Sequence, residues 1–350
     1  MTQALDHLVD WELAERTAAR LSGAGPQVSA SEAASVVAEL RASSVAAVGP
    51  VRAVTGLEAP TALGALVVDR PTWQRTNIAS FRGLLGPVAE EAITQRSRPI
   101  PGPVSAVGSR ITGAELGTVL GFLSSRVLGQ FDPFNGASRL LLVAPNIVHV
   151  ERELGVVASD FRLWVCLHEE THRVQFGATG WLDGHLIGEI RALLSDLMAQ
   201  PTQLAERLAG VLKDLPGIVR GHGGNGLLDA LQTQEQRDRL AGITAVMSLL
   251  EGHADVVMDD VGPQVVPTVA DIRQRFGRRR AGRGAVDQLL RRLLGLDAKL
   301  RQYADGARFV RAVIAEVGMP GFNAVWTSAE TLPKPTEIAA PKDWVRRVHG

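Results

Sequence analysis

Cysteine is almost absent from this chain, because Cys166 is the only one among 350 residues. A single thiol cannot form an internal disulfide, so a small secreted fold held together by disulfide bonds is excluded. Aromatic residues are scarce as well, at 5%, and Tyr303 is the only tyrosine. No excess charge of either sign is present, since 37 basic and 37 acidic residues cancel. The composition therefore predicts neither a nucleic acid nor an anionic membrane surface as a partner.

Long hydrophobic runs are missing too. No stretch reaches the roughly 18 uninterrupted apolar residues that a membrane-spanning helix requires. The first segment, MTQALDHLVDWELAERTAAR, is acidic and amphipathic. It lacks the basic start, the apolar middle and the small-residue cleavage site of a signal peptide. We therefore expect a cytoplasmic protein without a membrane span.

Helical periodicity of apolar residues is present over most of the length. Segments with this spacing include 31–44, 71–93 and 240–261. Ser31 is the expected N-cap of the first of these, because serine side chains accept hydrogen bonds from free backbone amides at helix starts.

Three segments depart from this periodicity. The short apolar run 139–150 predicts a strand. The Pro- and Gly-rich segment 96–109 predicts a loop, and the proline-punctuated tail LPKPTEIAAPKDW predicts an extended chain. Together these patterns predict a mainly α (α+β) fold with many helices and a small sheet. We expect a helical N-terminal region, 1–138, and a catalytic region, 139–350, packed as one globular unit.

The most informative stretch is HEETH, residues 168–172. On an α-helix, His168 and His172 lie about 40° apart around the axis and one turn apart along it, so both project from one face. Two imidazoles at this spacing can bind one tetrahedral zinc ion. Glu169 is rotated by about 100° from His168 and stays within reach of a metal-bound water, whereas Glu170 is about 200° away. The pattern predicts an HExxH motif with Glu169 as general base and Glu170 as a salt-bridge or capping residue.

A simpler interpretation is a solvated helix whose histidines and glutamates pair at the surface. The neighbouring residues oppose it, because Leu163, Trp164, Val165, Leu167 and Phe176 make the helix apolar on most sides. Histidines and a carboxylate on a buried helix need partners, since burying polar groups without compensation is costly. The metal-binding interpretation is therefore favoured.

A zinc ion in a catalytic site usually has three protein ligands and one water. The longer motif HExxHxxGxxH is excluded, because Gln175 and Ala178 stand at its Gly and last His positions. Three residues further along the chain are candidates for the third ligand: His185, Glu251 and His253.

Helix geometry favours Glu251 as the third ligand. Glu251 and Asp255 are four residues apart in LLEGHADVVMDD and share a helix face, whereas His253 lies about 200° from Glu251. A Glu-x-x-x-Asp helix that faces an HExxH helix is the gluzincin arrangement. In it, Glu251 would bind the zinc ion and Asp255 would accept a hydrogen bond from a ligand histidine. His253 remains the alternative ligand.

This constellation predicts hydrolysis. Zinc held by two histidines and Glu251 leaves a position for water and lowers its pKa. Glu169 would take the proton of that water as it attacks a peptide or amide carbonyl. The developing negative charge on the carbonyl oxygen needs a further donor. Tyr303 is a tentative candidate, although a tyrosine packed on a helix is the simpler interpretation, and His222 in a glycine-rich loop is a weaker one.

Several motifs in fixed order resemble a known family. They are HEETHRVQF followed by WL, then MSLLEGHADVVMD, LLGLDAKLRQYADGARFV and FNAVWTSAETLPKPTEIAAPKDWVRRV. This order is similar to that of bacterial zincin-like metallopeptidases, whose members are often labelled as associated with the biosynthesis of a deazaflavin coenzyme. The resemblance covers most of the chain.

The resemblance implies a mostly helical zincin-like fold with the HExxH helix at its centre. It implies the roles of His168, Glu169 and His172, and it implies no substrate, because the family is functionally uncharacterised. Three further residues that recur in the family imply that their helix lines the cleft: Lys299, Gln302 and Tyr303.

The sequence thus predicts a zinc-dependent hydrolase of gluzincin type, with a peptide or protein as its substrate. One alternative is a zincin-fold metal-binding protein without proteolytic activity, which acts by binding or regulation. Another is a metal-free helical interaction protein in which the histidines are core residues. Glu169 favours catalysis, because a binding protein has no need of a base at that position.

Overall fold

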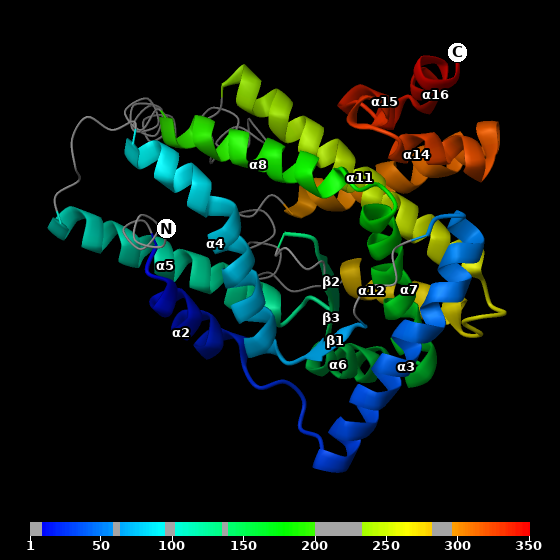
Figure 1. The fold of residues 1–350 in the computed structure, drawn as a ribbon. Helices are drawn as coiled ribbons and strands as arrows, with labels where there is room; N and C mark the ends of the chain where they lie inside the picture. Colours follow the sequence, from blue (N-terminus) through cyan, green and yellow to red (C-terminus); the bar gives the residue numbers. More distant parts are fainter. Residues whose placement is uncertain (1–8, 59–63, 95–101, 135–138, 200–232, 282–295) are drawn as a thin grey trace, which may run out of the picture.

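The structure is a computed structural model that describes residues 9–58, 64–94, 102–134, 139–199, 233–281 and 296–350 (Figure 1). Helices account for most of these residues. In chain order they are α2 (Trp11–Ser22), α3 (Ala30–Thr55), α4 (Arg70–Thr94), α5 (Gly102–Ser124), α6 (Ala144–Leu154), α7 (Ala158–Gly177), α8 (Leu182–Ala199), α11 (Gln234–Val261), α12 (Val269–Ala281), α14 (Leu296–Phe322), α15 (Pro335–Ala339) and α16 (Pro341–His349), with 3-10 turns η1 (Asn323–Trp326) and η2 (Ala329–Thr331).

A three-stranded sheet lies at the centre of the molecule (Figure 1). Its order is β1 (Leu66–Val68), β3 (Arg139–Val143), β2 (Gly129–Asp132), with β1 parallel and β2 antiparallel to β3. Successive side chains of a strand point to opposite faces. Accordingly, Leu140 and Leu142 of β3 pack with α3 and α7, whereas Leu141 and Val143 pack with α2, α4 and α5.

The fold is mainly α with a small sheet, as predicted. The sheet takes β1 and β2 from the region before residue 138 and β3 from the region after it. The hydrophobic core likewise joins α3 to α7 across this boundary. The division into 1–138 and 139–350 stays a prediction.

Four local predictions were wrong. The strand predicted for 139–150 ends at Val143, and α6 follows because Pro145 favours the first turn of a helix. The segment 102–109, predicted as loop, belongs to α5. Ser29, rather than Ser31, caps α3 by accepting a hydrogen bond from the Glu32 amide at 3.1 Å. The tail, predicted as extended, forms α15 and α16, each with a proline in its first turn.

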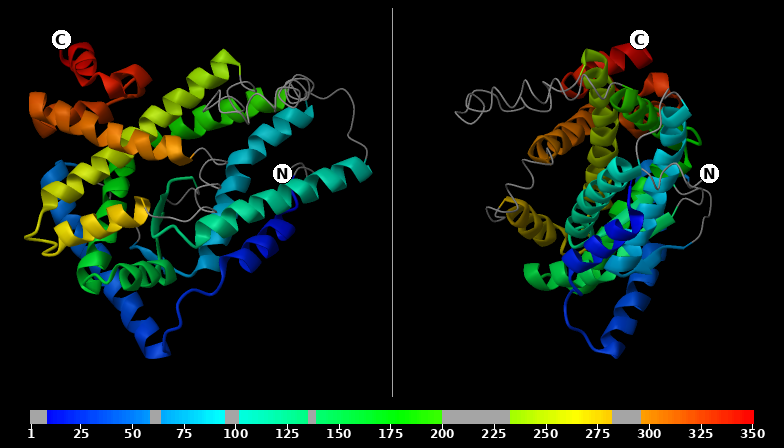
Figure 2. Two further views of the ribbon diagram at one scale, coloured as in Figure 1. Left: turned by 180° about the vertical axis from the view of Figure 1, so that it is seen from behind. Right: turned by 90° about the vertical axis from the view of Figure 1, so that its left-hand side faces the viewer.

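Helices α11 and α14 approach each other very closely where they cross, as Figures 1 and 2 show. A Cβ atom added to Gly252 would lie 2.2 Å from the carbonyl carbon of Gly306. A Cβ atom added to Gly306 would lie 1.9 Å from the carbonyl oxygen of Ser248. Because no side chain fits between these backbones, the two glycines fix how far α11 is displaced along α14.

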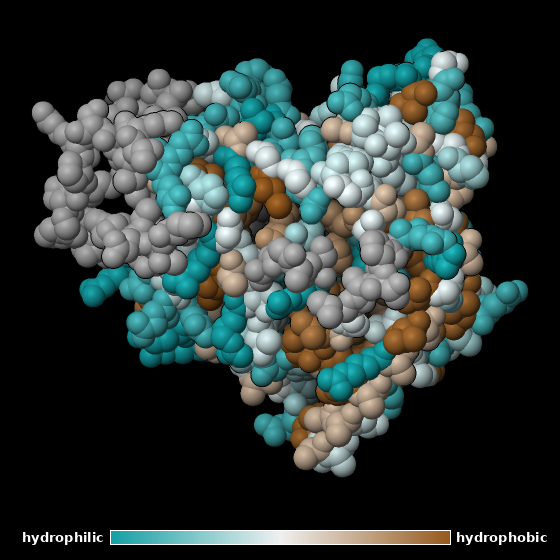
Figure 3. Space-filling view, viewed as in Figure 1, coloured by the Kyte–Doolittle hydropathy of each residue, from teal (hydrophilic) through white to brown (hydrophobic). Residues whose placement is uncertain are grey.

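Of the described helices, only α11 is long and apolar enough to cross a membrane. More than half of its most apolar window is buried inside the protein, which is the pattern of a core helix. The space-filling view shows hydrophilic and hydrophobic residues interspersed over the visible face (Figure 3).

Candidate metal centre

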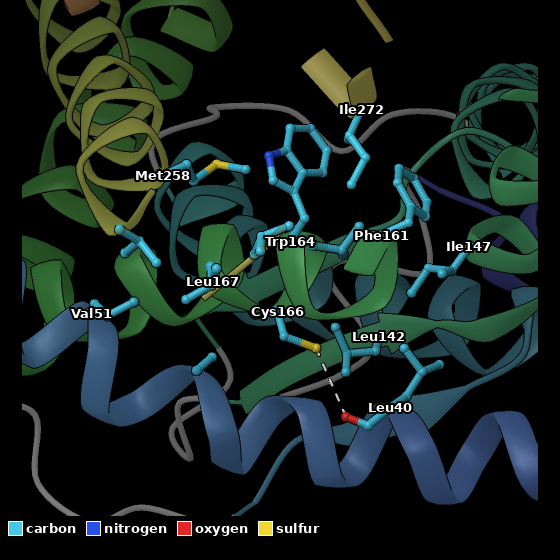
Figure 4. Close-up of a cluster of buried hydrophobic side chains, with 14 of the residues drawn as sticks. Leu40, Val51, Leu142, Ile147, Phe161, Trp164, Cys166, Leu167, Met258 and Ile272 are labelled. Carbon is cyan, nitrogen blue, oxygen red and sulfur yellow. Dashed lines mark hydrogen bonds between the residues drawn. The ribbon is translucent and has the colours of Figure 1, made fainter. Parts of the chain in front are cut away.

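Helix α7 carries the HExxH motif and is held in the core on several sides (Figure 4). Phe161 and Trp164 stack with 5.8 Å between their ring centroids. Cys166 points toward α3, and its thiol donates to the backbone carbonyl of Leu40 at 3.8 Å. Burial raises the pKa of the Cys166 thiol, so the residue stays protonated and serves as packing. This packing fixes the rotation of α7 about its axis.

The opposite part of α7 presents both histidines to α11. The Nε2 atoms of His168 and His172 are 3.1 Å apart. The two carboxylate oxygens of Glu251 lie 3.6 Å from His168 Nε2 and 3.8 Å from His172 Nε2. One ligand atom from each residue lies within 4.8 Å of the others. The structure thus brings together the three residues that the sequence indicated as metal ligands.

The spacing of these atoms fits a zinc ion. Zinc binds imidazole nitrogen and carboxylate oxygen at about 2.0–2.2 Å in a tetrahedral arrangement, which places neighbouring ligand atoms roughly 3.3–3.5 Å apart. The separations of 3.1, 3.6 and 3.8 Å bracket this value. Two neutral imidazoles and one carboxylate are also a ligand set that zinc enzymes use for catalysis. The three residues therefore fit the metal that the motif predicts.

Glu169 lies beside these ligands and is almost completely buried, with 5% of its surface exposed. Burial, and then the negative charge of Glu251, raise the pKa of its carboxyl group well above the ordinary value. A Cβ atom on Gly129 of β2 would lie 2.5 Å from the Glu169 carboxyl carbon, so β2 passes directly against this group. A buried carboxyl group with a raised pKa binds a proton more readily than an exposed one, which suits a general base.

The next residue, Glu170, has a different environment although it is equally buried. Arg173 donates to both of its carboxylate oxygens, from Nε at 2.7 Å and from Nη2 at 2.6 Å. A bidentate pair of this kind orients the carboxylate. Glu170 is therefore the salt-bridge residue that helix geometry indicated.

The second nitrogen of each histidine also has a neighbour. His172 Nδ1 lies 2.9 Å from the side-chain oxygen of Gln175, one turn along α7. His168 Nδ1 lies 3.3 Å from the sulfur of Met258 on α11. These contacts orient the rings so that both Nε2 atoms face Glu251.

Asp255, the residue expected to support a ligand histidine, lies against α12. Arg273 Nη1 donates to its carboxylate at 3.0 Å, and Nη2 donates to its backbone carbonyl at 2.8 Å. Asp255 lies one helical turn further along α11 than Glu251, nearer the protein surface, and its side chain is 44% exposed. A hydrogen bond from a ligand histidine to Asp255 stays a prediction.

His253, the alternative ligand, is completely buried on another side of α11. Its Nδ1 atom lies 3.0 Å from Gln175 Nε2, and its ring lies 5.1 Å from Phe322 and 5.4 Å from Trp326 between centroids. Burial, and then the charge of His172, lower the pKa of His253 to about 3, so the ring is neutral. In the described part of the chain, the ligand group contains Glu251 and not His253.

His185 is the remaining candidate ligand that the structure describes. His185 on α8 packs against Trp181, with 6.0 Å between the ring centroids, and does not join the ligand group. Tyr303 lies on α14, but its side chain is outside the described residues. His222 is outside them as well.

The sequence did not predict the contacts that two further residues make with the site. Gln175 is three residues after His172 and so shares its helix face, a signal that helix geometry could have used. Gly129 has no comparable signal, because its contact with Glu169 joins segments 40 residues apart.

Comparisons with known proteins agree with this geometry. A sequence-family profile of zincin-like metallopeptidases matches residues 9–345. Among solved structures, a candidate hydrolase with a novel fold from Chloroflexus aurantiacus is 31% identical, with a TM-score of 0.68. The similarity covers 98% of this chain and 99% of that one. No curated protein matches.

Proposed function

The chain belongs to the zincin-like metallopeptidase family, and from that premise we propose that it is a zinc-dependent hydrolase that cleaves peptide or amide bonds. The observation that carries the proposal is the convergence of His168, His172 and Glu251 beside a second, buried carboxyl group. A binding site for zinc alone needs only the first three. Glu169 adds a group that can exchange a proton.

A zinc ion held there would polarise a carbonyl group and lower the pKa of water. The chain's own residues supply the other functions. His168 and His172 of α7 and Glu251 of α11 would hold the ion. Glu169 accepts a proton as water attacks the carbonyl carbon and then delivers it to the leaving nitrogen. Gly129 keeps the backbone of β2 against this carboxyl group and limits its movement.

Zinc content tests the first half of the proposal. The purified protein should contain about one zinc ion per chain, and His172→Ala should contain far less. Near-zero zinc in both proteins would contradict the site. Glu251→Ala should weaken zinc binding much more than His253→Ala, since only Glu251 belongs to the ligand group. The reverse ranking would make His253 the ligand.

Hydrolysis of a mixed peptide library tests the second half. Glu169→Gln should keep its zinc and lose cleavage, by about 100-fold or more, because the proton acceptor is gone. The matched control is Glu170→Gln, which alters the neighbouring glutamate and should leave cleavage largely intact. Equal cleavage by Glu169→Gln and the unaltered protein would refute the assignment of the base.

One observation favours a second candidate, a zinc-binding protein without proteolytic activity. The carboxyl group of Glu169 is nearly inaccessible and lies directly under Gly129. A closed site of this kind can hold zinc without admitting a peptide. Full zinc occupancy, without cleavage of any peptide in the library by the unaltered protein, would support this candidate.

A further inference from the structure

The geometry points to Gln175 as a positioning residue that selects the metal-binding tautomer of His172 and ties it to the helix of Glu251. This inference rests on the proposed zinc site. Gln175 is fully buried, and its amide group lies between α7 and α11. It has three polar contacts: His172 Nδ1 at 2.9 Å, the Leu250 carbonyl oxygen at 2.9 Å and His253 Nδ1 at 3.0 Å.

The Leu250 carbonyl determines the orientation of the amide. A backbone carbonyl can only accept a hydrogen bond, so the amide nitrogen of Gln175 must face it. The amide oxygen must then face His172, and that oxygen can only accept. His172 Nδ1 therefore carries the proton. The Nε2 atom of His172 is left with a free electron pair, which is the form that binds a metal ion.

His253 completes the arrangement at the other end of the amide. The second proton of the Gln175 nitrogen points to His253 Nδ1, so this ring nitrogen accepts and His253 is protonated at Nε2. The His253 Nε2 atom has no hydrogen-bond partner among the described residues. His253 thus holds the amide rather than binding the metal.

The same amide links the two ligand-bearing helices. Leu250 directly precedes Glu251, so the hydrogen bond from Gln175 reaches α11 one residue before the carboxylate ligand. One side chain therefore sets both the tautomer of a ligand on α7 and the distance of that ligand from α11. Partners of this kind typically change metal affinity by about 10–100-fold when they are removed.

The test uses the full chain with Gln175→Leu, which removes every polar contact of the amide, and Gln175→Glu, which keeps only an acceptor for His172. The matched control is Gln74→Leu. Gln74 is also buried, and its nitrogen donates to the Ala18 carbonyl at 3.1 Å and to the Ser124 hydroxyl at 2.8 Å, among α2, α4 and α5. Zinc affinity is measured by competition with a chromophoric chelator. The tautomer of His172 is measured by nitrogen NMR of the metal-free protein.

In the unaltered protein, His172 should be protonated at Nδ1. Gln175→Leu should show mixed tautomers and bind zinc about 10–100-fold more weakly. Gln175→Glu should keep the Nδ1 proton and lose less affinity than Gln175→Leu. Gln74→Leu should lower the unfolding midpoint and leave zinc affinity unchanged, which separates positioning from a general loss of packing.

An Nε2 proton on His172 in the unaltered protein would overturn the inference. So would equal zinc affinities of Gln175→Leu and Gln74→Leu. If Gln175→Leu does not fold, an Nε2 proton on His172 in Gln175→Glu would overturn it equally. An unaltered protein that takes up no zinc would refute the proposed function, whereas the tautomer in the metal-free protein would still decide the role of Gln175.

Discussion

Helix α7 carries two clusters of ionisable side chains, and their charges are balanced in different ways. Near its start, Arg162 lies between two carboxylates from other helices. It donates to Glu151 of α6 at 3.0 and 2.6 Å and also contacts Glu39 of α3. Burial lowers the pKa of Arg162, but hydrogen bonds and charge from the two glutamates raise it overall, so the guanidinium keeps its positive charge and serves as the counter-charge of both carboxylates.

Near the end of α7, the two ligand histidines meet Glu169 and Glu251. Among the described residues, no arginine or lysine pairs with either of these carboxylates. The pKa of Glu169 is raised, whereas a neighbouring cation would lower it. The difference teaches how to distinguish the two clusters: the Arg162 cluster contains a cation that faces its carboxylates, whereas the candidate metal site contains carboxylates without such a cation among the described residues.

The largest effect should come from breaking the ion-pair cluster of Arg162, Glu151 and Glu39. Arg162→Met leaves Glu151 buried without its partner, and removing one member of a buried ion pair costs about 3–5 kcal/mol. Urea unfolding should show this loss, while zinc affinity of the folded protein stays unchanged. Arg16→Ala is the control, because the Arg16–Glu12 pair is exposed and should contribute at most about 1 kcal/mol. Equal losses in both variants would remove the distinction.

A smaller effect is expected where β2 meets Glu169 of the candidate metal site. Gly129→Ala places a Cβ atom 2.5 Å from the Glu169 carboxyl carbon, and overpacking of this kind costs about 1–3 kcal/mol. The variant should keep its zinc and lose hydrolysis, because the base is displaced. Gly188→Ala on α8 is the control: its Cβ atom meets nothing within 4 Å, so the helix should gain about 0.4–1 kcal/mol. Unchanged hydrolysis in Gly129→Ala would show that β2 does not hold Glu169.

The stability of the metal-free protein should depend on pH through Glu169 of the candidate metal site. The pKa of Glu169 is raised in the folded state, so its contribution to stability is full below the unfolded pKa and is lost as the pH rises. Glu169→Gln should therefore stabilise the metal-free protein at pH 7, on the order of 1 kcal/mol, and make little difference near pH 4. Thermal unfolding across this range measures the effect.

Glu337 is the control for this experiment, because its pKa is shifted in the opposite direction. Burial raises the pKa of Glu337, but hydrogen bonds from Arg347 and the Lys334 backbone lower it overall. Its contribution is present above the unfolded pKa and is lost as the pH falls. Glu337→Gln should thus destabilise the protein at pH 7 and have less effect near pH 4. Parallel pH profiles for the two variants would contradict both assignments.

The smallest effect concerns Cys166, midway between the two clusters. Its thiol is buried and its pKa is raised by that burial, so little thiolate forms at neutral pH. In native buffer the protein should react with a thiol reagent no faster than it unfolds, whereas in urea one thiol per chain should react at once. Rapid reaction in native buffer would show that this part of α7 opens readily.

The ligand-bearing faces were predictable because helix geometry is local. HEETH needs only the angle between successive residues to place His168 and His172 together and to separate Glu169 from Glu170. The facing helix followed from the same angle, which selected Glu251 over His253. These inferences depend on residues within two turns of one another.

Other features depend on contacts between distant segments, which periodicity does not report. The passage of Gly129 against Glu169 is set by strand pairing between β2 and β3. Asp255 has the spacing of a supporting residue, yet α12 brings Arg273 to it. In the tail, prolines were interpreted as breaks, although Pro335 and Pro341 begin helices there. In each case the local structure depends on contacts with segments that are distant in the sequence.

The contact between Gly252 and Gly306 has a consequence for how freely this protein can change. Because the two backbones touch there, the position of α11 relative to α14 is set by main-chain atoms and not by side chains that a substitution could change. Glu251 is the residue next to this contact. We therefore expect substitutions of the apolar residues around this contact to leave the position of the Glu251 carboxylate largely unchanged. Larger residues at these two positions should therefore move Glu251 away from the two histidines without altering any of the three side chains.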